Sequence, residues 1–81
     1  MEMVNVEKQL IGYFKERGNI VASKTPLLEE KIIDSMGVME LIAFIESSFN
    51  VEFTDDDLTV ENFQTIEAIL SVIMSKVGED Q

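Results

Sequence analysis

Apolar residues recur at the spacing of an α-helix in three separate stretches of this chain, and this pattern constrains the fold more than any other feature. Each stripe would bury one face of a helix. High aliphatic and low aromatic content favours packed helices over a β-sandwich, so we predict an all-α fold. The stripes are Val6, Leu10, Tyr13 and Phe14, then Val38, Leu41, Ile42, Ile45 and Phe49, and finally Ile66, Ile69, Leu70, Ile73 and Val77.

Residues that favour helix ends set the expected bounds of the three helices. Gly18 ends the first pattern, Asn50 suits a left-handed helix end, and a frayed tail is expected from Gly78. The expected spans are about 4–17, 35–49 and about 65–77. The expected N-caps are Asn5 for the first helix, Asp34 or Ser35 for the second, and Gln64 or Thr65 for the last.

The segment between the first two helices, residues 18–33, is long and irregular, and Pro26 prevents a regular hydrogen-bond ladder. We expect it to be pinned to the core, because long loops in compact domains are uncommon and this one is rich in apolar residues. These residues are Ile20, Val21, Leu27, Leu28, Ile32 and Ile33.

After the second helix, residues 51–53 alternate too briefly for a strand, and three aspartates at 55–57 predict one short helix with acids at its start. The predicted fold is a four-helix bundle with three main helices, a short third helix and a long loop between helices one and two. The length predicts a single domain over residues 1–81, with an ordered core at about 4–77.

Charge is distributed unevenly along the chain. Residues 1–31 hold five acidic and five basic side chains, whereas residues 32–75 hold nine acidic side chains and no basic one. Such a field repels nucleic acid and anionic lipid and attracts partners with Lys or Arg patches. The alternative interpretation is that the acidic surface serves solubility alone.

The chain has no Cys and no His, so it lacks disulfides, the commonest general base and the best side-chain nucleophile. It also lacks a Gly-rich phosphate loop, and we predict that it is not an enzyme. Absent Cys suits a reducing compartment. No apolar run is long enough for a membrane span, and no signal peptide is evident, so we expect a soluble cytoplasmic monomer.

The acidic cluster at residues 55–57, with Glu61, invites a calcium interpretation. The spacing fails the EF-hand pattern, because the required Gly and the closing Glu are missing. We therefore predict no metal site and interpret these acids as helix-start residues on a solvated face. Loose binding of divalent cations that relieves repulsion is the alternative.

Ser35 alone would be interpreted as a helix cap, but its surroundings suggest more. The sequence resembles the phosphopantetheine attachment region of acyl and peptidyl carrier proteins over about residues 25–75. The resemblance rests on helix order, loop length, size and acidic second half, and on these motifs: Pro26-Leu27 in the loop, Asp34-Ser35-Met36 at the helix start, Glu40-Leu41 shortly after, Phe44 to Phe53, and Leu58 to Phe63.

The resemblance implies a carrier protein of the acyl-carrier type, and we expect a stand-alone, specialised one. A phosphopantetheinyl transferase would move 4'-phosphopantetheine from coenzyme A to Ser35 with Mg²⁺. Acyl or aminoacyl groups would then travel as thioesters. Further implied partners are a loading ligase or synthetase and other enzymes of fatty-acid, polyketide or nonribosomal-peptide biosynthesis. The alternative function is a non-catalytic acidic interaction module in which Ser35 is only a cap.

Two positions depart from the family pattern. Met36 replaces the commoner Leu, which it approximates in volume. Lys31 stands where the family often has Gly, so a backbone with positive φ there would be strained.

The second helix has a second apolar side besides its core stripe. Met36, Met39 and Ala43 repeat at helical spacing, with acidic residues beside them. Small apolar contacts ringed by acids suit transient docking of enzymes with basic patches. The competing interpretation places both Met side chains in the core, and Phe44 is ambiguous. The predicted docking residues are Asp34, Met36, Met39, Glu40, Ala43 and Glu46.

Overall fold

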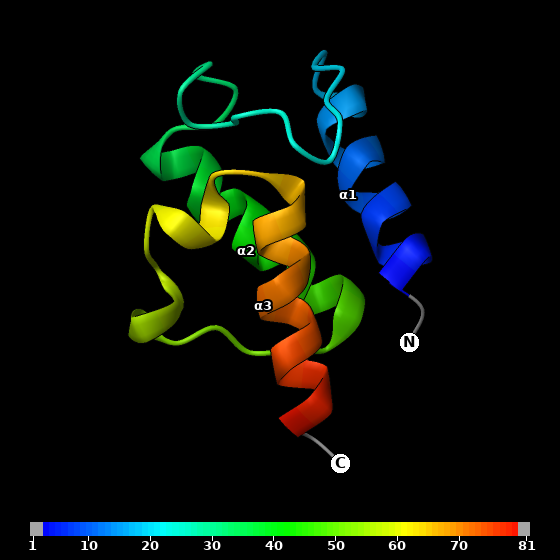
Figure 1. Cartoon of the computed structure of the whole chain (residues 1–81), viewed down its shortest axis with the longest axis vertical. Coiled ribbons are helices and arrows are strands. Elements are labelled where there is room, and N and C mark those ends of the chain that lie inside the picture. The colour runs from blue at the N-terminus through cyan, green and yellow to red at the C-terminus, as the bar shows by residue number, and fades with distance from the viewer. Residues whose placement is uncertain (1–2, 80–81) are drawn as a thin grey trace.

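The computed structural model describes residues 3–79, and within this range it contains helices and turns but no strand. The α-helices are α1 (Met3–Glu16), α2 (Ser35–Phe49) and α3 (Ile66–Glu79), and two 3-10 turns, η1 (Asp55–Asp57) and η2 (Glu61–Phe63), lie between α2 and α3. Figure 1 shows the three helices packed together, with a long connection from α1 to α2. The all-α prediction is confirmed.

The predicted short third helix is the part of the fold that differs. The chain forms two separate 3-10 turns there, because Leu58 leaves the helical region with φ −87° and ψ 67°. Its N–H bonds to the carbonyl of Asp55, which closes a tight turn instead of starting a longer helix. The fold is therefore a bundle of three α-helices with a turn-rich connection.

Helix bounds agree with the prediction at α2 and differ at the chain's outer ends. α1 begins at Met3, so Asn5 lies inside the first turn and is not the N-cap. α3 continues to Glu79, so the prediction of a frayed tail from Gly78 is wrong for Gly78 and Glu79. Residues 80–81 lie outside the described range. At its start, Thr65 accepts a hydrogen bond from the N–H of Ala68 at 3.0 Å.

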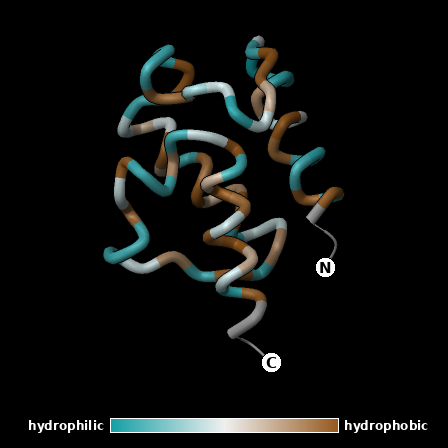
Figure 2. The backbone as a smooth tube through the Cα atoms, viewed as in Figure 1, coloured by the Kyte–Doolittle hydropathy of each residue, from teal (hydrophilic) through white to brown (hydrophobic). Residues whose placement is uncertain are grey.

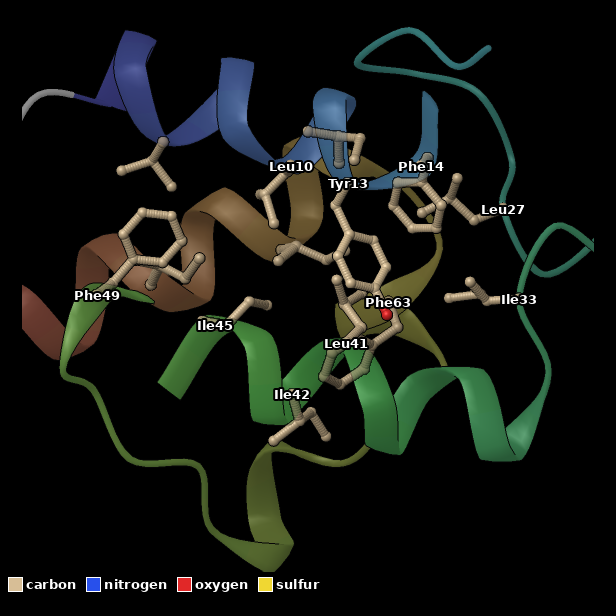
Figure 3. Close-up of a cluster of buried hydrophobic side chains, with 14 of the residues drawn as sticks. Leu10, Tyr13, Phe14, Leu27, Ile33, Leu41, Ile42, Ile45, Phe49 and Phe63 are labelled. Carbon is tan, nitrogen blue, oxygen red and sulfur yellow. The ribbon is translucent and has the colours of Figure 1, made fainter. Parts of the chain in front are cut away.

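All three predicted stripes contribute to one core, and Figure 3 shows residues of α1 and α2 pointing into it. Figure 2 shows apolar residues recurring between polar ones along α1, as amphipathic packing requires. Each buried Val, Leu, Ile or Phe side chain contributes about 1.5–3 kcal/mol relative to exposure. Three stripe residues are only partly buried, namely Val38, Leu70 and Val77.

The long segment between α1 and α2 is pinned as predicted, with one exception. Its buried anchors are Val21, Leu27 and Ile33, and Leu28 and Ile32 pack partly against the core. Ile20 is 80% exposed, so its expected anchoring is wrong. The path of the loop turns Ile20 outward, and its neighbour Val21 faces the core instead.

Lys31 lies in the left-handed region, with φ 59°. A glycine would adopt this backbone freely, whereas a lysine there costs about 1–2 kcal/mol. The departure at this position therefore strains the loop locally and leaves the path of the chain intact.

Candidate functional site

The start of α2 presents Ser35 to solvent and assigns the capping role to its neighbour. Asp34 has the extended backbone of an N-cap residue, and its carboxylate accepts a hydrogen bond from the N–H of Gly37 at 2.8 Å. Ser35 is exposed, and its hydroxyl takes part in none of the hydrogen bonds found within residues 3–79. Of the two predicted cap candidates, the structure selects Asp34.

Gly37 fits this cap closely, which the sequence alone did not reveal. A Cβ added there would lie 3.3 Å from the Asp34 carboxylate and 3.4 Å from the Cβ of Ile33. The first distance is tighter than ordinary van der Waals contact, and the second lies at its lower limit. Glycine thus lets the last loop residues approach the first turn of α2 without displacing the capping carboxylate.

The local electrostatics suit an attached phosphate in part. The first N–H groups of α2 lack helical partners and the helix dipole is positive there, which favours an anionic group such as a phosphate beside Ser35. Asp34 is exposed beside it and repels a phosphate. Its carboxylate is committed to the cap, which gives the acid beside the serine a structural role.

A pocket of about 250 Å³ opens beside Ser35. Both connecting segments and α2 supply its walls, and apolar side chains dominate them. Ser35 therefore presents an exposed hydroxyl next to a pocket with space for an apolar group. The lining residues are Leu28, Ser35, Val38, Met39, Leu58, Thr59, Val60 and Phe63.

Sequence reasoning did not identify most of these walls. Leu28, Leu58 and Phe63 read as ordinary apolar residues, and only their meeting in space forms a pocket. The signals available in the sequence were the resemblance of residues 58–63 to the carrier family and the apolar character of Leu58 and Val60 in an acidic, turn-rich segment.

The second face of α2 is exposed, as the docking interpretation requires. Met36 and Met39 are 76% and 58% exposed, so the interpretation that they fill the core is wrong. The other predicted docking residues on this exposed side are Asp34, Glu40 and Ala43. Exposed thioethers and acids on one side are the arrangement that transient docking uses.

Two further residues of α2 are occupied within the fold. Glu46 is half-buried, and its carboxylate accepts a hydrogen bond from the N–H of Phe53 at 2.9 Å, so it fixes the segment after α2. Phe44 packs against Tyr13 with ring centroids 4.8 Å apart and against Phe49 at 6.3 Å. Phe44 therefore covers the core between α1 and the end of α2.

The acidic cluster after α2 contains one engaged and two exposed aspartates. The Asp57 carboxylate forms an ion pair with the ammonium of Lys76 at 2.6 Å and accepts the N–H of Thr54 at 2.7 Å. The Lys76 ammonium, followed by the Thr54 N–H, lowers the pKa of Asp57. Asp55 and Asp56 are exposed. Within the described range, no three acidic side chains gather closely enough to hold a metal ion.

Comparison with known proteins gives a consistent result. The family model for the phosphopantetheine attachment site matches residues 14–73. An acyl carrier protein of Buchnera aphidicola subsp. Baizongia pistaciae is 29% identical over 93% of this chain and 99% of its own length. Another, from Buchnera aphidicola subsp. Schizaphis graminum, is 31% identical over 91% and 96%.

A third relative carries a different kind of name. Aminoacyl carrier protein 2 of Bradyrhizobium diazoefficiens is 26% identical, over 93% of this chain and 90% of its own length.

Among the described residues, no helix combines the length and the apolar character needed to cross a membrane.

Proposed function

Because the chain belongs to the family defined by the phosphopantetheine attachment site, we propose that it carries acyl or aminoacyl groups on a 4'-phosphopantetheine arm attached to Ser35. One observation carries the assignment to this residue. Ser35 is exposed at the start of α2 while Asp34 makes the cap, so the fold does not require the Ser35 hydroxyl. This arrangement argues against the alternative in which Ser35 is only a cap.

The arm supplies the thiol that this Cys-free chain lacks, and the thiol holds the cargo as a thioester. The chain's own contribution is to present one hydroxyl beside N–H groups that favour a phosphate. No hydrogen-bonded base touches that hydroxyl among the described residues, so a phosphopantetheinyl transferase must activate it. Carrier domains of this family are not enzymes, which confirms the prediction made from the missing His and Cys.

The relatives and the pocket both bear on the class of cargo in this proposal. Two relatives are named for acyl groups and one for aminoacyl groups, so either class is compatible with the family. The apolar pocket beside Ser35 favours an apolar acyl group or side chain over a charged one. A loading ligase or synthetase and enzymes of lipid, polyketide or nonribosomal-peptide type are the partners this function calls for.

The exposed side of α2 is the docking surface in this proposal. Met36, Met39 and Ala43 supply apolar contact beside Ser35, and Asp34 and Glu40 supply charge. Glu46 adds charge at the far end of the surface. Its carboxylate also accepts a hydrogen bond from the segment after α2, which limits how far the side chain can reach toward a partner.

Incubation with coenzyme A and a transferase of broad specificity tests the attachment. Wild type should gain the mass of one arm, and Ser35→Ala should gain none. Ser47→Ala, which changes an exposed serine on the same helix, is the matched control and should be modified like wild type. Unmodified wild type beside an active control carrier, or modification of Ser35→Ala, would contradict the proposal.

The same assay tests the docking surface through its rate. Glu40→Lys should lower kcat/KM for arm transfer by about tenfold, because one unfavourable charge at a close contact costs about 1.4 kcal/mol or more. Glu67→Lys makes the same change in net charge at an exposed position of α3 and should alter the rate much less. Equal slowing by both variants would show that general charge, not this surface, guides the transferase.

A further inference from the structure

One wall of the pocket beside Ser35 has little to hold it. Leu58 and Val60 are 42% and 65% exposed, and Thr59 between them is also exposed. These residues join η1 to η2 in the connection that Figure 1 shows running from α2 round to α3. Segments with few buried apolar contacts open at low free energy, so this wall needs another restraint to keep a fixed shape.

An ion pair ties the start of this wall to the last helix. The Lys76 ammonium on α3 lies 2.6 Å from the Asp57 carboxylate, and the two side chains are only 15% and 22% exposed. The same carboxylate oxygen accepts hydrogen bonds from the N–H of Thr54 at 2.7 Å and from its hydroxyl at 3.1 Å. The backbone carbonyl of Asp57 also accepts the side-chain amide of Asn62 at 2.9 Å. Turn η1 is thus fastened to α3 and to the start of η2.

Aromatic contacts extend this restraint to the pocket itself. The Lys76 ammonium also lies 5.3 Å from the ring centre of Phe53. The Phe53 ring contacts that of Phe63 with centroids 6.0 Å apart, and Phe63 is a buried lining residue of the pocket. The Lys76 ammonium on α3 therefore contacts both the Asp57 carboxylate and the Phe53 ring, and these two residues lead into the pocket wall.

This cation has no substitute nearby in the sequence. Lys76 is the only basic residue after Lys31, and it follows nine acidic residues with none between them to balance the charge. It also forms the one ion pair found within residues 3–79. A neutral residue at this position would leave Asp57 among like charges and free the turn to move outward.

We propose that Lys76 is a positioning residue for the carrier site, which clamps residues 53–63 onto α3 and so holds the pocket wall beside Ser35 in place. The inference rests on the proposed function for its role with cargo. Its structural part concerns the unmodified protein alone. The two parts can therefore be tested separately.

Hydrogen exchange of the unmodified protein tests the clamp. Lys76→Met should raise the amide exchange rates of residues 58–63 by about three- to tenfold relative to α1 amides. Lys8→Met changes net charge equally on an exposed part of α1 and should leave these rates unchanged. Lys76→Arg keeps the cation and should retain the protection. Equal protection in Lys76→Met and Lys8→Met would overturn the inference.

Loading the arm with an octanoyl group tests the role toward cargo. In wild type, backbone chemical shifts of Leu58, Val60 and Phe63 should change on loading, and in Lys76→Met these changes should fall by at least about half. Unchanged loading shifts in Lys76→Met would contradict a positioning role even if exchange had increased. If wild type accepts no arm, the proposed function fails, and the exchange experiment still decides whether the clamp exists.

Discussion

The two connections between helices, residues 17–34 and 50–65, both line the pocket beside Ser35 but differ in how firmly their pocket walls are held. The first is fixed by apolar burial. Its anchors Val21, Leu27 and Ile33 are at most 7% exposed. The Leu27 N–H also donates to the carbonyl of Gln64 at 2.8 Å, so the two connections touch there.

The second connection also has buried residues, Val51 and Phe63, but its pocket wall at residues 58–60 is exposed and directly follows the Lys76–Asp57 ion pair. Buried apolar anchors separate only when the core opens, whereas a partly exposed ion pair can open locally. The comparison indicates a pocket with one firm wall, at Leu28, and one adjustable wall, at residues 58–60. A carrier that must take up and release cargo can use such a difference.

The largest expected effect comes from removing an anchor of the first connection. Leu27→Ala should lower the free energy of unfolding by about 2–5 kcal/mol, because Leu27 is fully buried and a cavity would remain. Leu58→Ala, in the exposed wall, should lower it by less than about 1 kcal/mol. Urea denaturation followed by circular dichroism measures both values, and similar losses would remove the proposed difference between the connections.

A smaller effect should appear in the pH dependence of the second connection. The Lys76 ammonium and the Thr54 N–H lower the pKa of Asp57 in the folded state. Its contribution to stability is therefore complete above the ordinary Asp value near 3.9 and is lost as pH falls through the lowered pKa.

Asp57→Asn should thus be less stable than wild type at about pH 7, and the gap should narrow at about pH 3. Urea midpoints of the two proteins at both pH values measure this gap. Comparison of the pair cancels the protonation of the remaining acids, which both proteins share. A gap of constant size would show that the charge on Asp57 does not restrain the turn.

Local features of the sequence predicted the firm parts of this molecule. The α2 stripe, the acidic cap and Asn50 together fixed the helix at Ser35–Phe49, and Asn50 ends it in the left-handed region with φ 56°. The apolar loop residues indicated the pinned connection. These signals are local or depend only on a residue being apolar, so they can be recognised without knowing the fold.

The adjustable wall could not be predicted in the same way. Lys76 and Asp57 are 19 positions apart, and only the return of α3 past η1 brings them together. The aspartate run read as a helix start, whereas Leu58 breaks it into turns. The role of Gly37 likewise depends on how closely the loop approaches α2.

Location of the arm on the chain tests the central claim most directly. After reaction with coenzyme A and a transferase, proteolysis and fragment mass spectrometry should place one phosphopantetheine group on Ser35 in every modified molecule. The exposed hydroxyls of Ser47, Ser48, Thr54 and Thr59 should stay unmodified. An arm found on any of these residues, or an unmodified Ser35 peptide in a modified protein, would contradict the account.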